Sequence, residues 1–315
     1  MARAWPAVQV VPPGRLAYGM QLPIVAQSPI FAQPWEAGAG TPDVVRIAEA
    51  CDRAGFFYLA VSDHICIPRE RALAMSIVWF DPVATLGFLA AATRQVRLLS
   101  YVYVLPYRHP LATAKAFATL DALSGGRVIL GVGAGHLEAE FRTLGVDFAR
   151  RGRLVDEAID VIVKAFLDEF PDHAGPTWTI HGVGVGPRPR QRPRPPIWVG
   201  GSTRAALRRA AERGDGWLPQ GVPPMGLAEA IAYVRRVRGD EPIEIGANSP
   251  WLYVGTPSFD LGPNARSGPG EVLAGILLDL KALGVNHVGV RFRTRSVDEL
   301  LDQIDAFAHE VAPHL

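Results

Sequence analysis

Short apolar runs and longer amphipathic segments alternate along the chain. The apolar run Leu16–Val25 predicts a strand. The next segment, Thr41–Gly55, carries apolar residues every three or four positions, which is the spacing of one helix face. Its second residue is proline and its last is glycine, which are typical of a helix start and a helix end. The two segments predict one strand–helix unit.

The same alternation continues to the C-terminus and predicts eight strands. They are expected at Leu16–Val25, Phe57–Ser62, Val96–Leu105, Val128–Val132, Ile197–Val199, Trp217–Leu218, Ile243–Val254 and Val288–Phe292. The helices between and after them are expected at Thr41–Gly55, Asp81–Thr93, Pro110–Leu123, Arg153–Phe166, Thr203–Gly214, Gly226–Arg238, Gly270–Gly284 and Val297–His309. Eight such units in 315 residues favour a closed parallel (β/α)8 TIM barrel over an open doubly wound sheet. An open sheet would also predict a dinucleotide-binding glycine fingerprint in its first unit, and Gly14–Gly19 contains none.

We therefore expect a single α/β domain over residues 1–315, with an N-terminal extension at 1–15. Two connections are longer than usual: Ile65–Phe80 after the second strand, and the Pro- and Arg-rich segment Leu167–Pro196 before the fifth. Both are predicted to be lid-like insertions over the barrel mouth, and a solvated linker is an equal alternative for the second. In such a barrel the catalytic and binding groups follow the carboxyl ends of the strands.

Composition narrows the class of protein. Hydrophobic residues make up 49% and charged residues 20% of the chain, which excludes a disordered protein and allows a large core. A net charge of +1 provides no global basic field, so neither nucleic acid nor an anionic membrane is an expected partner. Cys51 and Cys66 lack metal-ligand spacing, which argues against a disulfide framework and a metal site. The chain has no long apolar run and no leader pattern in Met1–Pro13, which predicts a cytoplasmic location.

Two candidate chemical groups follow early strands. His64, beside Asp63 at the end of the second strand, can exchange a proton near neutral pH. The alternative is a histidine that satisfies a backbone carbonyl next to an aspartate that caps a turn. Gly131–Gly135 has glycine at alternate positions, which allows a ligand to lie against the main chain, although a tight turn would give the same residues.

Two further features lie at the third and fifth strands. Gly200–Gly201–Ser202 opens a helix and offers N–H donors suited to a phosphate, with an ordinary helix cap as the alternative. The third strand places large side chains around Tyr101 and Val102, where barrel interiors usually hold aliphatic residues. A bulge or strained peptide that projects into the mouth would explain them, and so would two tyrosines on an exposed face.

These motifs occur in a fixed order along the chain. They are Ser62–Asp63–His64, Asp81–Pro82, Arg108–His109–Pro110, Ser124–Gly125–Gly126–Arg127, Gly131–Val132–Gly133, Arg188–Pro189, Gly200–Gly201 and Gly214–Asp215–Gly216–Trp217. Together, from about Leu16 to Phe307, they resemble the luciferase-like monooxygenase superfamily, in particular its oxidoreductases that use the deazaflavin coenzyme F420.

The resemblance implies a function and a site. A hydride would pass between F420 and a small organic substrate at the barrel mouth, with His64 or His136 as the catalytic residue that handles the proton. Asp63 and His64 would face the reactive edge of the ring, and a non-proline cis peptide near Tyr101 would support it. The implied cofactor-binding residues are Asp63, His64, Tyr101, Val102, Gly133, Ala134, Gly135, Gly200, Gly201 and Ser202.

The chain departs from the family pattern at one position. Sugar-phosphate dehydrogenases of this family have a glutamate acid where this chain has His136, so their substrate is not carried over. His136 can still donate a proton, and Glu138 and Glu140, one turn away, are alternatives. Arginines of Arg188–Arg194 are expected to pair with the anionic polyglutamate tail of F420.

Two other functions remain open. One is an FMN-dependent monooxygenase on the same fold, supplied with reduced flavin by a separate reductase. The other is a barrel that binds a cofactor without turnover. We also expect a homodimer, which is common in such families, and an apolar or aromatic substrate because aromatic residues are expected at the rim. Those residues are Trp35, Trp79, Tyr103, Tyr107, Trp217 and Trp251.

Overall fold

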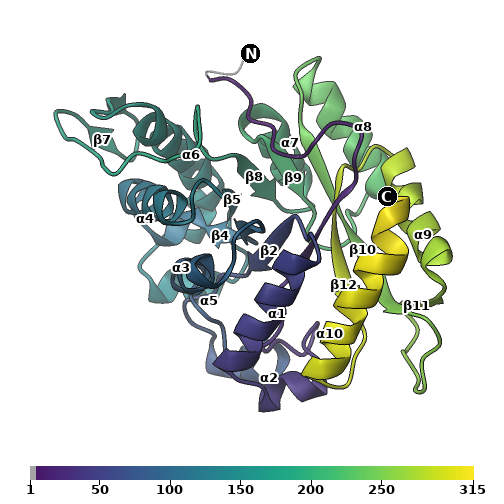
Figure 1. Cartoon of the computed structure of the whole chain (residues 1–315). Coiled ribbons are helices and arrows are strands. Elements are labelled where there is room, and N and C mark those ends of the chain that lie inside the picture. Colours follow the sequence, from purple (N-terminus) through teal and green to yellow (C-terminus); the bar gives the residue numbers. More distant parts are fainter. Residues whose placement is uncertain (1–4) are drawn as a thin grey trace.

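The computed structural model describes residues 5–315 and shows eight strand positions closed into a parallel barrel (Figure 1). The strands of the wall are β1 (Ala17–Gln21), β2 (Tyr58–Val61), β3 (Arg97–Ser100), β5 (Val128–Gly133), β8 (Ile197–Gly200), β9 (Gly216–Leu218), β10 (Glu244–Val254) and β12 (His287–Phe292). Each strand pairs in parallel with the next, β12 pairs with β1, and the pairing of β9 with β10 completes the ring. The predicted TIM-barrel class is confirmed, and each predicted strand position holds a strand.

Helices surround the barrel, as the pattern predicted (Figure 1). They are α1 (Thr41–Arg53), α3 (Pro82–Ala92), α4 (Pro110–Leu123), α6 (Arg151–Leu167), α7 (Arg204–Arg213), α8 (Leu227–Arg238), α9 (Gly270–Ala282) and α10 (Val297–Ala306). Their starts follow from local chemistry: the Asp81 carboxylate accepts a hydrogen bond from the Ala84 amide at 2.9 Å and so caps α3. Among residues 5–315, no helix is long and apolar enough to cross a membrane.

Several short elements lie outside the predicted pattern. They are α2 (Ala72–Met75), α5 (Glu138–Thr143), the antiparallel pair β6 (His173–Ala174) and β7 (Thr179–Ile180), β11 (Ala265–Gly268) beside β10, and the 3-10 turns η1 (Pro34–Gly38), η2 (Arg69–Arg71), η3 (Leu105–Tyr107), η4 (Phe148–Arg150) and η6 (Ala312–His314), with a π turn, η5 (Phe307–Val311), after α10. The predicted third strand is divided: β3 ends at Ser100, and β4 (Tyr103–Val104) continues the same position by pairing with β5.

The floor of the barrel is sealed by the N-terminal segment. Val11 packs into the cluster of side chains that fills the barrel interior, which includes Tyr58 and Trp198. The amides of Val10 and Val11 donate to the Glu244 carboxyl at 2.7 and 2.6 Å. Burial raises the pKa of Glu244 to about 7. The amino ends of the strands are therefore closed, which leaves the carboxyl ends for a ligand.

The Pro- and Arg-rich segment also reaches the floor, which corrects one expectation. The Gln191 side chain donates to the backbone oxygen of Val128, the first residue of β5, at 2.8 Å. Arg194 is fully buried and donates to Asp215 at 2.6 Å. The expectation that Arg188–Arg194 bind the F420 tail at the mouth is wrong, because this stretch lies at the opposite end of the barrel. A lid role for the two long insertions stays a prediction.

Candidate functional site

The strand ends carry the predicted site residues to one rim. The register pairs Val61 of β2 with Ser100 of β3, and Val132 of β5 with Val199 of β8. The loops that follow these strands therefore start at similar heights on the barrel. The rings of His64 and His136 meet edge to face, with 5.6 Å between their centroids.

Asp63 is held by a salt bridge. Its carboxylate accepts two hydrogen bonds from the Arg108 guanidinium, at 2.6 and 2.9 Å, and a third from the Val104 amide at 2.8 Å. Asp63 is 4% exposed, so these bonds are shielded from water. Asp63 thus ties the end of β2 to the turn after β4, and its predicted contact with a cofactor stays a prediction.

The hydrogen-bond partner of His64 is the buried carboxylate of Glu140, which the sequence suggested only as an alternative proton donor to His136. Oε2 of Glu140, on α5, lies 2.9 Å from His64 Nδ1 and accepts a hydrogen bond from the Tyr107 hydroxyl at 2.8 Å. Its second oxygen, Oε1, accepts from the amides of Ile65 at 2.5 Å and Cys66 at 3.1 Å. The Glu140 side chain is fully buried, so four hydrogen bonds replace its hydration.

The charge of Glu140 determines which ring nitrogen of His64 carries a proton. Burial alone would raise the pKa of Glu140, but the hydrogen bonds from His64, Cys66 and Tyr107 outweigh burial and lower it. Burial and the neighbouring Glu140 both raise the pKa of Tyr107, which therefore stays a hydrogen-bond donor. An ionised carboxylate only accepts hydrogen bonds, so Nδ1 of His64 must carry a proton. Nε2 is then the nitrogen of His64 that exchanges protons.

His136 and Trp79 border the His64 ring. Trp79, from the insertion after β2, contacts it with 4.5 Å between ring centroids. The surrounding protein lowers the pKa of His136, and the nearby His64 lowers it further. His136 is exposed, and its predicted part as the proton donor stays a prediction.

The end of the third strand has the backbone feature that the resemblance implied. The peptide between Tyr101 and Val102 is cis. The Tyr101 hydroxyl donates to the Pro219 backbone oxygen at 2.9 Å across the barrel. A Cβ on Gly133 would lie 2.4 Å from a methyl carbon of Val102, and a Cβ on Gly200 would lie 2.5 Å from its other methyl carbon. The glycines are thus required by the packing of Val102, and their contact with a ring stays a prediction.

In the loop after β8, several of the groups predicted to donate to an anion form hydrogen bonds within the protein. The Gly201 amide donates to the Leu218 backbone oxygen at 3.0 Å. The Ser202 hydroxyl donates to the Gln220 backbone oxygen at 2.8 Å, and Thr203, rather than Ser202, caps α7. A phosphate here would be bound by backbone amides at the start of α7 rather than by the Ser202 hydroxyl. This binding stays a prediction.

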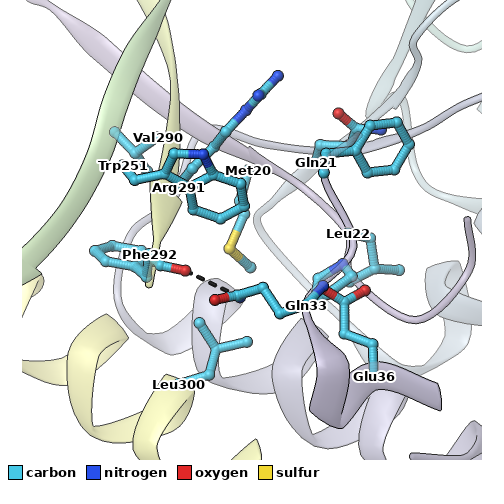
Figure 2. A pocket seen from close by; sticks show the side chains of 12 residues that line it. Met20, Gln21, Leu22, Gln33, Glu36, Trp251, Val290, Arg291, Phe292 and Leu300 are labelled. Carbon is cyan, nitrogen blue, oxygen red and sulfur yellow. Dashed lines mark hydrogen bonds between the residues drawn. The ribbon is translucent and has the colours of Figure 1, made fainter. Parts of the chain in front are cut away.

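The main hollow of the mouth lies beside β1 and β12 (Figure 2). Its cavity volume is about 40 Å3, it opens to solvent, and its wall is mainly apolar. The residues around it include Met20, Leu22, Phe31, Trp251, Arg291 and Phe292. A smaller hollow of about 10 Å3 lies deeper in the barrel, next to Tyr101 and Asn248, and Arg291 lines both. Sequence reasoning did not predict this side of the mouth as the main cavity.

The predicted aromatic rim is only partly present. Trp251 lines the main hollow and Trp79 covers His64. Trp217 is fully buried and donates to the Gly201 backbone oxygen at 2.8 Å. Tyr103 is also buried and packs against Phe117. Trp217 and Tyr103 therefore stabilise the barrel wall and do not line the mouth.

The fold and the site define a barrel with a buried carboxylate–imidazole pair and a glycine-lined wall at its open end. Residues 20–256 match the model of the family described as luciferase-like monooxygenase. The chain belongs to this family, whose members are oxidoreductases and monooxygenases.

Similar proteins include a monooxygenase and an F420-dependent reductase. An uncharacterized protein of Mycobacterium tuberculosis is 33% identical over 219 residues, which cover 66% of this chain and 74% of that protein. The 4-hydroxyprotoasukamycin monooxygenase of Streptomyces nodosus is 30% identical over 67% of this chain and 54% of its own length. The structure of the coenzyme F420-dependent tetrahydromethanopterin reductase of Methanopyrus kandleri matches with a TM-score of 0.73 and 17% identity, over 96% of this chain and 99% of that one. The last likeness shows the fold alone.

Proposed function

We propose that this protein is an F420-dependent oxidoreductase that transfers a hydride between the deazaflavin and a small organic substrate at the barrel mouth. The observation that carries the proposal is the buried His64–Glu140 pair, with 2.9 Å between Nδ1 and Oε2. Hydride transfer to or from a carbonyl or alkene needs a matching proton transfer, and a histidine held in one tautomer supplies it. The ordered family motifs support F420 as the hydride carrier.

The wall of the mouth suits a flat ring. Because Gly133 and Gly200 have no side chains, the two methyl groups of Val102 lie directly against the backbones of β5 and β8. Val102 and the backbones of the two glycines thus form a close-packed wall, on which a tricyclic ring would lie. When bound, F420 would supply or accept the hydride. The protein would contribute the platform, the proton at His64 Nε2 and shielding of that ring by Trp79.

His64 acts through its tautomer. Glu140 accepts from Nδ1, so the neutral imidazole has a bare Nε2 that accepts a proton, and the protonated imidazole donates one from the same atom. Tyr107 and the amides of Ile65 and Cys66 hold the carboxylate in place. His64 Nε2 therefore stays in one position whether it accepts or donates the proton.

Binding and turnover test the proposal separately. Purified protein is titrated with F420 and with FMN, each oxidised and reduced, and fluorescence quenching is followed. Reduced F420 is then mixed, without oxygen, with a panel of carbonyl and alkene compounds, and the absorbance of oxidised F420 is followed. We expect micromolar F420 binding and turnover that Glu140→Gln lowers and Arg142→Gln, a change at an exposed residue of the same helix, does not. Binding of FMN but not F420 would overturn the proposal.

A second candidate is a reduced-flavin monooxygenase. The supporting observation is the 30% identity to the 4-hydroxyprotoasukamycin monooxygenase of Streptomyces nodosus. This function would require a separate reductase to supply the flavin. Oxygen consumption in the presence of FMN, a flavin reductase and NADH, above the rate of the reductase alone, would favour it over hydride transfer to F420.

We further propose that the protein is a homodimer that buries α3 and α4. The sequence of α3, Pro82–Ala92, contains no charged residue, yet Phe88 on it is 52% exposed. Leu123, at the end of α4, is 74% exposed. Exposed apolar side chains on adjoining helices are typical of a contact between chains. Sedimentation should show a dimer that Phe88→Lys dissociates and Phe170→Lys does not. A monomeric wild type would contradict this proposal.

A further inference from the structure

Two arginines lie at the end of β12: Arg291 within the strand, and Arg293 directly after its last residue, Phe292. Side chains alternate along a strand, so His287, Gly289 and Arg291 point to the same side. His287 stacks on Trp198 inside the barrel, with 4.1 Å between ring centroids, which identifies that side as the interior. Arg291 therefore enters the mouth from the interior face, and Arg293 follows two residues later.

Both guanidinium groups lie against Trp251. The Arg293 guanidinium carbon is 4.1 Å from the centroid of that ring, and that of Arg291 is 5.8 Å away. Cation–π contact of this kind orients a guanidinium without neutralising its charge. Figure 2 shows Arg291 running past Trp251, with its guanidinium turned away from the apolar wall of Phe292 and Leu300.

Neither arginine has an anionic partner among the described residues. The structure of residues 5–315 shows no ion pair or side-chain hydrogen bond for Arg291 or Arg293, and Nε of Arg293 is buried without a partner. Burial lowers the pKa of Arg293, as expected for a cation that lacks a counter-ion. A buried donor without an acceptor is costly, so such a group indicates a missing partner.

The acidic residues of the mouth are already engaged. Asp63 binds Arg108, and Glu140 binds His64 and its neighbours. Glu36, which also lines the main hollow, accepts from the amides of Ile24 and Gln33, both at 2.8 Å. Figure 2 places Glu36 on the opposite wall from the Arg291 guanidinium. The positive charge at β12 is therefore left for a ligand.

We infer that Arg291, Trp251 and Arg293 form an anion site that binds the carboxylate of the substrate, whose apolar body fills the adjoining hollow. Guanidinium groups bind carboxylates through paired hydrogen bonds, and the Trp251 ring against which both guanidinium groups lie also lines the hollow. This inference rests on the proposed function, since it defines the substrate of the same mouth.

The anion could in principle come from the substrate or from the tail of the cofactor. The predicted phosphate position is the loop after β8, and the barrel order places β9 and β10 between β8 and β12. An interstrand spacing of about 4.8 Å puts the ends of β8 and β12 roughly 14 Å apart along the wall. The substrate is therefore the better source of the carboxylate.

A binding experiment without turnover tests the site. The protein is titrated with 3-phenylpropionate and with its uncharged amide, and Trp251 is expected to report binding through tryptophan fluorescence. We expect the acid to bind at least about tenfold more tightly than the amide, and Arg291→Gln or Arg293→Gln to remove most of that difference. Arg295→Gln is the matched control, because Arg295 lies on the surface and is paired with Glu299. Equal binding of acid and amide, or variants that bind the acid normally, would overturn the inference.

The same variants separate the two sources of the anion and the two proposals. Binding of F420, FMN and riboflavin to Arg291→Gln should match that of wild type within about threefold, a small effect beside the loss of an ion pair. If FMN or F420 binding falls as much as acid binding while riboflavin binding does not, the anion belongs to the cofactor tail and the inference is wrong. If no cofactor binds but the acid still depends on Arg291, the proposed function fails and the anion site stands.

Discussion

Glu140→Gln replaces one acceptor oxygen by an N–H donor at the centre of four hydrogen bonds. In the wild type, one carboxylate oxygen faces His64 and Tyr107, and the other faces the amides of Ile65 and Cys66. All four neighbours can donate. A glutamine side chain has one oxygen, so one pair of donors keeps an acceptor and the other pair meets the amide nitrogen.

The cost of this change can be worked out from the geometry. Two hydrogen bonds to a charged acceptor, from His64 and Tyr107, are replaced by hydrogen bonds with a neutral amide, at a net cost of about 1.5 kcal/mol each in a buried site. We therefore expect Glu140→Gln to lower the free energy of unfolding by about 3 kcal/mol. Tyr107→Phe removes one of the four bonds and should cost about 1.5 kcal/mol by the same reasoning.

The catalytic effect depends on which way the glutamine turns. The backbone amides cannot change their role as donors, whereas neutral His64 can move its proton from Nδ1 to Nε2 and accept from the glutamine N–H. The variant should therefore have His64 with a protonated Nε2, which no longer accepts a proton in the neutral form. Losing this general-base function should lower turnover by about 10²- to 10⁴-fold, with cofactor affinity unchanged.

Three measurements check this reasoning, and only one of them needs a substrate. Urea unfolding gives the stability, nitrogen NMR of the imidazole gives the tautomer, and turnover of reduced F420 gives the catalytic effect. The pKa of Glu140 in the folded protein lies below its ordinary value of 4.5, so its contribution to stability is present above that pH and is lost as the pH falls through the folded-state pKa. The stability difference between wild type and Glu140→Gln should therefore narrow below pH 4.5. A His64 that keeps its proton on Nδ1 in the variant, with unchanged stability, would refute the account.

Three other replacements probe the wall and the interior by urea unfolding. Gly200→Ala should cost about 2 kcal/mol, because its Cβ would lie 2.5 Å from a methyl of Val102, and the cost should largely vanish in the Val102→Ala background. Burial lowers the pKa of His287 to about 3. The unfolded chain binds a proton at this histidine below about pH 6.5, and the folded protein does not. As the pH falls from about 6.5 toward 3, the free energy of unfolding therefore decreases by about 1.4 kcal/mol per pH unit. His287→Phe should gain about 2 kcal/mol over wild type between pH 7 and pH 5, and a constant difference would contradict this. Asp63→Asn breaks the buried pair with Arg108 and should cost about 3 kcal/mol, whereas a change within about 0.5 kcal/mol would show that the pair does not hold the rim.

The barrel could be predicted because its signal is local. Buried strands such as Val128–Val132 are continuous apolar runs, and helices such as Pro110–Leu123 begin with proline and end before glycine. The order of these units defines the topology, and the topology brings the loops after β2 and β5 to one rim. The hairpin β6–β7 escaped prediction because strands of two residues have no periodicity.

The contacts within the site could not be predicted in the same way. Glu140 is 76 residues from His64 in sequence, and nothing in either motif shows that one accepts a hydrogen bond from the other. The contacts of the arginines in the segment before β8 could not be predicted from the sequence either. Their charge suggested an anion at the mouth, but Arg194 pairs with Asp215 at the floor, because a long connection can reach either end of a barrel.

Within the described part of the chain, charged side chains are paired at the floor of the barrel and unpaired on the β12 side of the mouth. At the floor, Arg194 and Asp215 are both fully buried and pair with each other, so each charge loses its hydration and gains a partner there. At the mouth, Arg291 and Arg293 have no anionic partner among residues 5–315, and their guanidinium groups lie against Trp251. Unpaired charge in a cleft does not stabilise a fold, and proteins retain such groups where a ligand supplies the missing partner. The floor is therefore built for stability, and the unpaired charge on the β12 side of the mouth supports the proposed anion site.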